Sequence, residues 1–441
     1  MQKKHLKLLS LTLCAAMCGS LAACSSGGGD DSGSSEGSSG GNTLEVAYNL
    51  TTEDFSVFEQ IIQDFTEETG VEVTIYNGGD DYESAMKTRM SSGDLPDVWV
   101  THGWSLNRYS EYMMDLSDQD WVADIDEGLK EVITNDDGEL FILPITQAIA
   151  AIMYNKDVLT QAGVDASQIR TWEDFTNACQ AVADNTEASP IEICMGDGFD
   201  SYSLECIWPT LYSNEDAPSY AADSLKDGSF DWKADGLEGF QMLADWDKAG
   251  FMNKDKVSCQ KDDICRALAN GEGAFALYST EMIPSVLAYN ESANIGILPV
   301  PAATADGASY FGTGEGNFSC FGIWKDTEYE EECKQLLEYL AQPEVATKIV
   351  QIDGGIPALN TIELDESHQS AYTANAFREA QQQFDGDLIY DNFFDREYLP
   401  SGMWSVMADA VAAQLSSSDS QASIEDAAGI VSDNYNDLMG N

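Results

Sequence analysis

Basic residues are scarce in this sequence. Its 441 residues include 21 lysines and arginines against 77 aspartates and glutamates, which gives a formal net charge of −56 at pH 7. A surface with such a field repels phosphate backbones and anionic lipids. We therefore exclude nucleic acid as a partner and favour a neutral or cationic ligand, although the acidity also suits the solubility of an exported protein.

Residues that carry catalysis are also few. The chain has 3 histidines and no HExxH motif. A G-x-S-x-G pattern at residues 33–37 falls in a glycine- and serine-rich tract, where the strained turn of a nucleophile elbow cannot form. The glycines of "FGTGEG" (311–316) do not have the spacing of a dinucleotide or phosphate loop. We expect neither enzyme activity nor a cofactor.

Paired cysteine motifs are missing as well. No CxxC occurs, so a zinc knuckle or a thioredoxin-type site is unsupported. Of the 10 cysteines, Cys14, Cys18 and Cys24 lie near the N-terminus, and the others have an irregular spacing that makes a poor disulfide framework. The acidic turn at residues 135–138 lacks the EF-hand pattern, so calcium binding stays open but unsupported, and we assign no metal ligands.

Long apolar runs are absent too. After the N-terminal segment, no run without charges approaches the roughly 20 residues that a membrane-spanning helix needs. The N-terminus has three lysines before a short apolar stretch at residues 8–17, which is the layout of a secretory signal peptide. The apolar stretch and the residues after it contain no charge before Asp30.

The end of this segment resembles a lipobox. "LAAC" (21–24) is similar to the motif of bacterial lipoproteins in which the cysteine takes a diacylglycerol and cleavage occurs just before it. The resemblance implies a signal peptide over 1–23, a lipidated (palmitate-carrying) Cys24 and a flexible tether over 24–42, which would anchor the mature chain to the extracellular face of the cell membrane. The alternative is an ordinary signal peptide with a free or paired Cys24.

The rest of the chain can build real cores, since 43% of the residues are hydrophobic and 10% aromatic. Alternation at 44–48, a helical period over 55–65 and alternation at 71–75 predict a strand–helix–strand unit with a parallel sheet. A second such region has a strand over 149–159 and a capped helix over 171–185. Helical stripes also occur over 329–340 and 404–415. The length and pattern predict an α/β protein in two lobes.

Five motifs occur in an order that resembles a known family. They are "GDLPDVWVTHG" (93–103), "LPITQAIAAIMYNKDVLTQAG" (143–163), "TWEDF" (171–175), "GEGAFALYS" (271–279) and "GGIPAL" (354–359). Together they are similar to the extracellular solute-binding proteins of carbohydrate ABC importers, the family that contains the maltose-binding proteins. The similarity covers the chain from about residue 44 to the C-terminus.

This resemblance implies a fold and a function. The fold would be the two-lobed periplasmic-binding-protein type II fold, with lobe 1 over 43–148 and 282–325, lobe 2 over 149–281 and 326–441, and hinge strands between them. A monomer would close its lobes on a mono- or oligosaccharide and deliver it to ABC permease subunits without chemistry. Its contact with the membrane would be through the lipid anchor only.

The resemblance also implies candidate ligand-binding residues. Sugar sites combine flat apolar faces with planar hydrogen-bonding groups. By position the candidates are Glu53, Asp80, Asp81, His102, Trp104, Gln147, Trp208, Tyr278, Glu281, Glu315, Asn317 and Trp404. Trp99, Trp172 and Trp324 are instead expected in the core. Thr101 and Glu281 stand where maltose-type proteins carry tryptophan, which argues against maltodextrin as the ligand.

Two other functions remain open at this point. A protein of the same fold could bind a solute that is not a sugar, although the surplus of candidate aromatic residues disfavours this. A surface glycoside hydrolase is the second alternative, because a pair of carboxylates placed by the fold cannot be found by sequence spacing.

Overall fold

The computed structural model describes residues 43–49, 52–78, 82–100, 110–315, 319–366, 369–384 and 388–440. The expected signal peptide, Cys24 and the tether lie outside these residues. Among the described residues, no helix combines the length and the apolar character that crossing a membrane requires.

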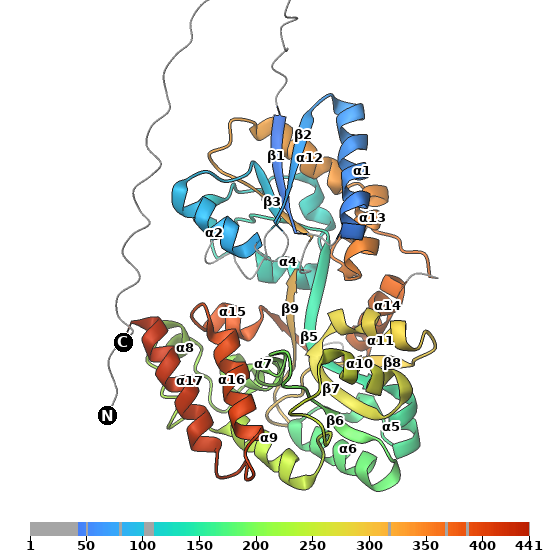
Figure 1. The fold of residues 1–441 in the computed structure, drawn as a ribbon, viewed down its shortest axis with the longest axis vertical. Helices are drawn as coiled ribbons and strands as arrows, with labels where there is room; N and C mark the ends of the chain where they lie inside the picture. The colour runs from blue at the N-terminus through green and yellow to red at the C-terminus, as the bar shows by residue number, and fades with distance from the viewer. Residues whose placement is uncertain are drawn as a thin grey trace, which may run out of the picture. The chain divides into compact units, whose positions relative to one another are not determined.

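The described residues form a five-stranded and a seven-stranded sheet (Figure 1). The first has the order β2 (Glu72–Asn77), β1 (Thr43–Tyr48), β3 (Val98–Val100), β10 (Cys320–Ile323) and β4 (Leu143–Pro144). β1 pairs in parallel with β2 and β3, whereas β10 is antiparallel to β3 and β4. The expected parallel unit is therefore confirmed, with α1 (Thr52–Thr69) connecting β1 and β2.

The second sheet is built around one long strand. Its order is β12 (Leu388–Asp391), β9 (Ser309–Glu315), β5 (Thr146–Asn155), β7 (Gly273–Ser279) and β6 (Ser189–Glu192), and both β8 (Ile295–Leu298) and β11 (Ile356–Pro357) also pair with β5. All ten residues of β5 are buried, as expected for a strand with partners on both edges.

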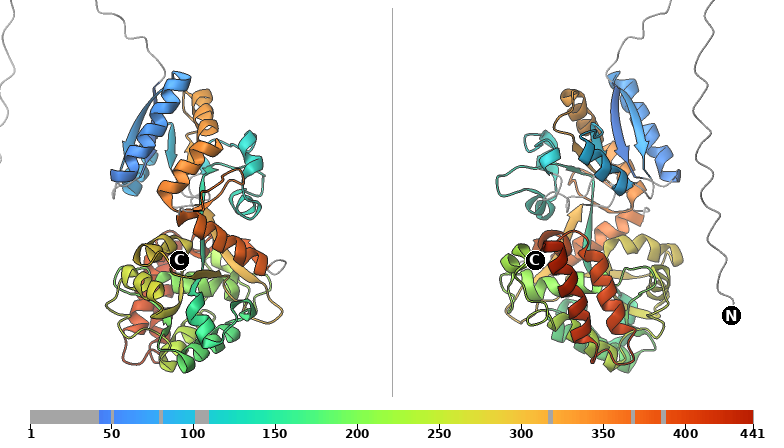
Figure 2. Two further views of the ribbon diagram at one scale, coloured as in Figure 1. Left: turned by 90° about the vertical axis from the view of Figure 1, so that its right-hand side faces the viewer. Right: turned by 60° about the vertical axis from the view of Figure 1, so that its left-hand side comes forward.

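Helices surround each sheet. The first carries α1, α2 (Tyr82–Ser92), α4 (Glu127–Ile133), α12 (Glu330–Leu340) and α13 (Pro343–Asp353). The second carries α5 (Lys156–Ala162), α6 (Trp172–Asn185), α7 (Ser201–Trp208), α8 (Ala222–Asp227), α9 (Glu238–Ala249), α10 (Lys261–Asn270), α11 (Ile283–Tyr289), α14 (Gln369–Gln383), α15 (Phe394–Tyr398), α16 (Met403–Leu415) and α17 (Ile424–Met439). Figure 2 shows α16 and α17 side by side on one flank.

The chain passes between the sheets by short routes. A single residue, Ile145, separates β4 of the first sheet from β5 of the second. The chain returns where β9 of the second sheet leads toward β10 of the first. We call β5 and β9, which pair with each other, the crossover strands (Figure 1).

Two sets of buried residues define the lobes, and they differ from the expected boundaries. Residues 283–298 pack with the second sheet, and α12 and α13 pack with the first. Lobe 1 therefore comprises residues 43–145 and 319–354 with Ala358 and Leu359, and lobe 2 comprises residues 146–315, β11 and residues 369–440. The expectation that residues 282–325 belong to lobe 1 was wrong, because β8 pairs with β5 of the second sheet. The expectation that residues 326–441 all belong to lobe 2 was also wrong, because the apolar stripe of α12 covers the first core.

A second boundary also differs. The strand expected over 149–159 ends at Asn155, and α5 begins at Lys156. The Asn155 side chain accepts hydrogen bonds from the backbone N–H groups of Asp157 and Val158, each at 3.0 Å. This cap satisfies two donors of the first helical turn, so the apolar residues after Asn155 become helical rather than extended.

Candidate functional site

The carboxyl ends of three parallel strands meet at one edge of the first sheet. β1 ends at Tyr48, β2 at Asn77 and β3 at Val100. The Tyr82 hydroxyl joins two of these ends, since it lies 2.6 Å from the carbonyl oxygen of Val100 and 3.3 Å from that of Ala47. This is the edge at which open α/β sheets bind ligands.

Most lobe 1 candidates follow these strands and lie outside the described residues. They are Asp80, Asp81, His102 and Trp104, and Asn317, which comes after β9, also lies outside the described residues. Glu53 lies in α1 and Glu315 ends β9, but the positions of their side chains are not described. These assignments stay predictions.

Lobe 2 presents an aromatic cluster at the end of β7, which we define as Phe199, Tyr202, Tyr278 and Trp404. Ser279, the last residue of β7, pairs with Ala150 of β5, so this end of the sheet is the one at which the chain arrives from lobe 1. The ring centroids of Tyr202 and Tyr278 are 4.4 Å apart, and those of Phe199 and Tyr278 are 5.4 Å apart. The cluster thus comes from the loop before α7, from α7, from β7 and from α16.

Trp404 is the partly exposed indole of this cluster. Its ring packs edge-on against Tyr202, with centroids 4.8 Å apart and an interplanar angle of 85°. The guanidinium carbon of Arg396 lies 5.2 Å from the centroid of the indole. Trp404 follows the N-cap Gly402, whose φ of 103° favours glycine and starts α16 directly after the turn.

Charged groups border the aromatic cluster. Glu281 follows β7 and is half-buried, and its negative charge adds to the effect of burial, which raises the pKa of Tyr202 well above its usual range. Arg396 acts in the opposite direction on the same phenol. Glu281 and Arg396 therefore both lie close enough to Tyr202 for their charges to act on its phenol, and Arg396 also contacts the partly exposed indole of Trp404.

A buried carboxylate pair supports Arg396. Asp395 forms an ion pair with Arg396, and only 2% of the Asp395 side chain is exposed. Glu205 of α7, which is fully buried, accepts hydrogen bonds from the backbone N–H groups of Phe394 and Asp395 at the start of α15. Burial raises the pKa of Glu205 well above its usual range, and the charge of Asp395 adds to this increase.

Tyr278 is not exposed to a ligand in this structure, contrary to expectation. Only 3% of the residue is accessible, and its hydroxyl has no hydrogen-bond partner among the described residues. Its ring instead packs against the ring of Tyr202, with the centroids 4.4 Å apart. We therefore assign Tyr278 to the base of the aromatic cluster.

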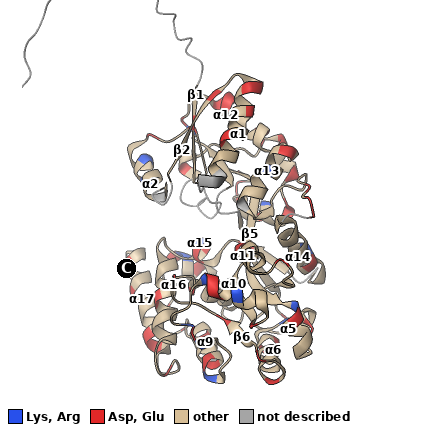
Figure 3. Cartoon of the chain, turned by 45° about the vertical axis from the view of Figure 1, so that its right-hand side comes forward, with Lys and Arg blue, Asp and Glu red and all other residues tan. Residues whose placement is uncertain are grey.

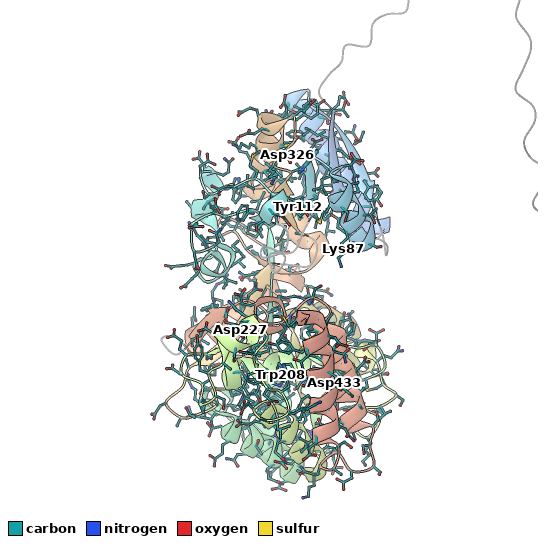
Figure 4. The ribbon with its side chains drawn as sticks, turned by 90° about the vertical axis from the view of Figure 1, so that its left-hand side faces the viewer. Lys87, Tyr112, Trp208, Asp227, Asp326 and Asp433 are labelled. Atoms are coloured by element: carbon teal, nitrogen blue, oxygen red, sulfur yellow. The ribbon has the colours of Figure 1, made fainter. Side chains whose placement is uncertain are left out.

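Trp208 was wrongly expected to stack on a ligand. It has no exposed surface, and its ring lies 4.5 Å from that of Trp232 and 5.7 Å from that of Phe394. Gly239 packs against the same indole so closely that a Cβ there would lie 2.7 Å from its Nε1. Figure 4 shows Trp208 among the side chains of lobe 2. The apolar face of α7 places it in the core.

Gln147 also has a different role from the expected one. It is 2% exposed in β5, where its Nε2 donates to the carbonyl oxygen of Pro357 at 3.2 Å and its Oε1 lies 3.4 Å from the hydroxyl of Thr313. Its amide therefore links β5 to β11 and β9 at the crossover. The buried, bonded amide has no free face for a ligand in this structure.

No group of three or more metal-ligating side chains occurs among the described residues. The seven described cysteines are all buried, and no disulfide joins any two of them. Burial raises the pKa of each thiol whose shift is resolved, Cys179 and Cys206 among them, which opposes thiolate chemistry. Trp99 and Trp172 are buried in the cores, as expected, whereas Trp324 packs at the margin of the first core.

Comparison with known proteins identifies the family. The family model described as "Bacterial extracellular solute-binding protein" matches residues 48–347. The chain belongs to this family. By this description, members of the family are extracellular and bind solutes.

Individual relatives cover nearly the whole chain. The melibiose/raffinose/stachyose-binding protein MelE of Bacillus subtilis is 27% identical over 372 residues, which are 83% of each chain. A binding protein of Bacillus subtilis in an open conformation has a TM-score of 0.78 at 24% identity, covering 92% of this chain and 99% of that one. A Bacillus licheniformis sugar transporter in complex with stachyose has a TM-score of 0.71 at 25% identity, covering 90% and 100%. The expected type II periplasmic-binding-protein fold is confirmed.

Sequence reasoning missed Tyr202 and Arg396. Both lie in segments without a family motif, "SYSLECIW" (201–208) and "FDREY" (394–398). The one available signal was the closeness of "FDREY" to Trp404, since an arginine just before an aromatic helix start can lie over the ring. Only the packing of α7, α15 and α16 brings these residues together.

Proposed function

We propose that this protein captures an oligosaccharide of the α-galactoside type, such as raffinose or stachyose, and presents it to an ABC permease. The observation that carries the proposal is the partly exposed Trp404, which contacts Tyr202 and Arg396 at the end of lobe 2 where the crossover strands enter. MelE, whose name records melibiose, raffinose and stachyose, supports this choice of sugar.

The chemistry of the cluster suits a sugar ring. The C–H face of a pyranose is apolar and flat, and an indole offers it a matching surface. Sugar hydroxyls need donors and acceptors, because buried polar groups without partners cost free energy. Glu281, whose charge acts on Tyr202 of the same cluster, supplies acceptors for these hydroxyls. The net charge of −56 disfavours an anionic ligand in the same place.

The remaining parts of the proposal rest on sequence. We infer that Cys24 carries the lipid, that the protein acts as a monomer, and that Glu53, Asp80, Asp81, His102, Trp104, Glu315 and Asn317 complete the site. The carboxyl edge of the first sheet, to which most of these residues are adjacent in sequence, supports this assignment. The protein performs no chemistry in this role.

Titration calorimetry tests the proposal directly. The purified chain without its signal peptide is titrated with melibiose, raffinose and stachyose, and with maltotriose and sn-glycerol 3-phosphate as comparison ligands. We expect micromolar or tighter binding of raffinose or stachyose and no binding of the phosphate ester. Binding only to solutes that are not sugars, or release of free galactose on incubation with raffinose, would refute it.

A further inference from the structure

Arg396 is held on one side and covers an aromatic ring on the other. Its guanidinium pairs with Asp395, and 19% of its side chain is exposed. Asp395 is held in turn, since its backbone N–H donates to the buried Glu205. The guanidinium is thus fixed through a chain of contacts that begins inside α7.

Trp404 is confined by two neighbours. The rings of Tyr202 and Trp404 meet at an interplanar angle of 85° with centroids 4.8 Å apart, and the guanidinium carbon of Arg396 lies 5.2 Å from the centroid of the indole. Tyr202 itself is fixed, because it is buried and packs on Tyr278. A tryptophan in contact with both a fixed phenol and a fixed guanidinium has little freedom to change its rotamer.

We propose that Arg396 is a positioning residue that fixes the indole of Trp404 for the sugar, by a cation–π contact. This inference rests on the proposed function. A stacking surface that is already ordered loses less side-chain entropy when ligand binds. The contact also depends on the planar shape of the guanidinium, so a lysine keeps the charge but not the stacking.

The variants Arg396→Met and Arg396→Lys separate positioning from direct contact. We expect Arg396→Met to weaken raffinose binding roughly 3- to 30-fold, the range of a partly desolvated cation–π contact, and Arg396→Lys to recover only part of the loss. In a Trp404→Ala background, Arg396→Met should change the dissociation constant less than twofold. An equal loss in both backgrounds would show a direct contact between Arg396 and sugar and overturn the proposal.

A second readout needs no ligand. With 5-fluorotryptophan incorporated, the ¹⁹F resonance of Trp404 is assigned by its disappearance in Trp404→Phe. In the free protein we expect Arg396→Met to shift and broaden this resonance while the other tryptophan resonances stay unchanged. An unchanged Trp404 resonance would overturn the proposal even if the protein bound no sugar, so this result is independent of the proposed function.

Arg170 provides a matched control. Its guanidinium lies 4.0 Å from the centroid of the Phe384 ring, also in lobe 2 but away from the aromatic cluster. Arg170→Met removes the same type of contact and should leave both the raffinose affinity and the Trp404 resonance unchanged. If Arg396→Met fails to fold, Asp395→Asn, which weakens the hold on the guanidinium, is expected to broaden the Trp404 resonance in the same way; a sharp, unshifted resonance there would refute the proposal.

Discussion

Two tryptophans that looked alike in the sequence differ in what surrounds them. Trp404 follows a glycine turn and keeps part of its ring accessible, whereas Trp208 is enclosed by Trp232, Phe240 and Phe394. A ring contributes to binding only through the surface it offers, and to stability through the surface it buries. The two residues should therefore separate binding from folding.

Trp404→Ala tests this distinction. Removal of a central aromatic contact costs about 2–4 kcal/mol of binding free energy, which corresponds to a roughly 30- to 700-fold weaker dissociation constant for raffinose. Because the ring is only partly buried, the melting temperature without ligand should change little. In Trp208→Ala the loss should instead be about 3–5 kcal/mol of folding stability, with nearly unchanged affinity in the folded fraction. Calorimetry beside thermal unfolding measures both quantities, and the reverse pattern would remove Trp404 from the site.

Glu192 makes stability depend on pH. Burial raises its pKa from 4.5 to about 8, and the charges of Asp255 and Glu272 add to the increase, while Ser189 and Arg266 oppose it. The folded state therefore holds a proton that the unfolded chain releases above pH 4.5. The stabilisation is complete below about pH 4.5 and is lost as the pH rises toward 8, with a slope of up to about 1.4 kcal/mol per pH unit.

Glu192→Gln should reduce this dependence, because the amide is neutral at every pH. We expect the free energy of unfolding of the wild-type protein, measured with urea, to fall more steeply between pH 6 and 8.5 than that of the variant. Asp200, whose pKa burial raises to about 7, contributes equally to both proteins. Parallel slopes would show that Glu192 is ionised in the folded state.

At the scale of elements, helix ends with local signals were predictable from the sequence. α6 was expected over 171–185 and is observed over Trp172–Asn185, because Thr171 and Asp174 form a reciprocal cap. The end of β5 was not predicted, since the apolar residues on both sides of Asn155 suit a strand and a helix equally. The side-chain cap of Asn155 decides the boundary, and it depends on where the chain turns.

The features that the sequence did not predict depend on packing between distant segments of the chain. The helical spacing of the apolar residues in α12 does not show which of the two cores they cover. The predicted lobe boundary was wrong there for this reason. Trp208 and Gln147 have the residue types of a sugar site, but the sheet and the helices around them turn both inward. The cluster of Tyr202, Arg396 and Trp404 needs three separate helices and could not be derived from sequence spacing.

Thr171→Ala tests the cap of α6. The Thr171 hydroxyl accepts from the backbone N–H of Asp174 at 3.1 Å, and the Asp174 carboxylate accepts from that of Thr171 at 3.0 Å. Loss of the first bond should lower the free energy of unfolding by about 1 kcal/mol, with raffinose affinity unchanged. Glu173→Ala, at the neighbouring exposed position, serves as the control. It should lower the free energy of unfolding by less than about 0.5 kcal/mol. An equal effect of the two substitutions would contradict the capping role.

For the whole molecule, the net charge of the surface and the N-terminal sequence together bear on how the protein is held at a membrane. Figure 3 shows acidic positions outnumbering basic ones on the helices around both sheets. An acidic surface is repelled by an anionic membrane, so attraction to the surface cannot hold this protein there. We therefore propose that the protein is held at the membrane by the lipid anchor that the "LAAC" sequence at 21–24 predicts.

Cys24→Ala tests the anchor. Each buried methylene of an acyl chain contributes about 0.8 kcal/mol, and two chains hold a protein firmly where one holds it only reversibly. Without the thiol, we expect the protein to be released into the medium or to remain as an uncleaved precursor, as seen by fractionation and by the mass of the purified chain. Raffinose affinity should stay within about twofold, because the 24–42 segment separates the cysteine from β1, the first described strand. Cys18→Ala is the matched control and should leave both the mass and the location of the mature protein unchanged. A Cys24→Ala protein that is cleaved normally and still partitions entirely into detergent would contradict lipidation at this residue.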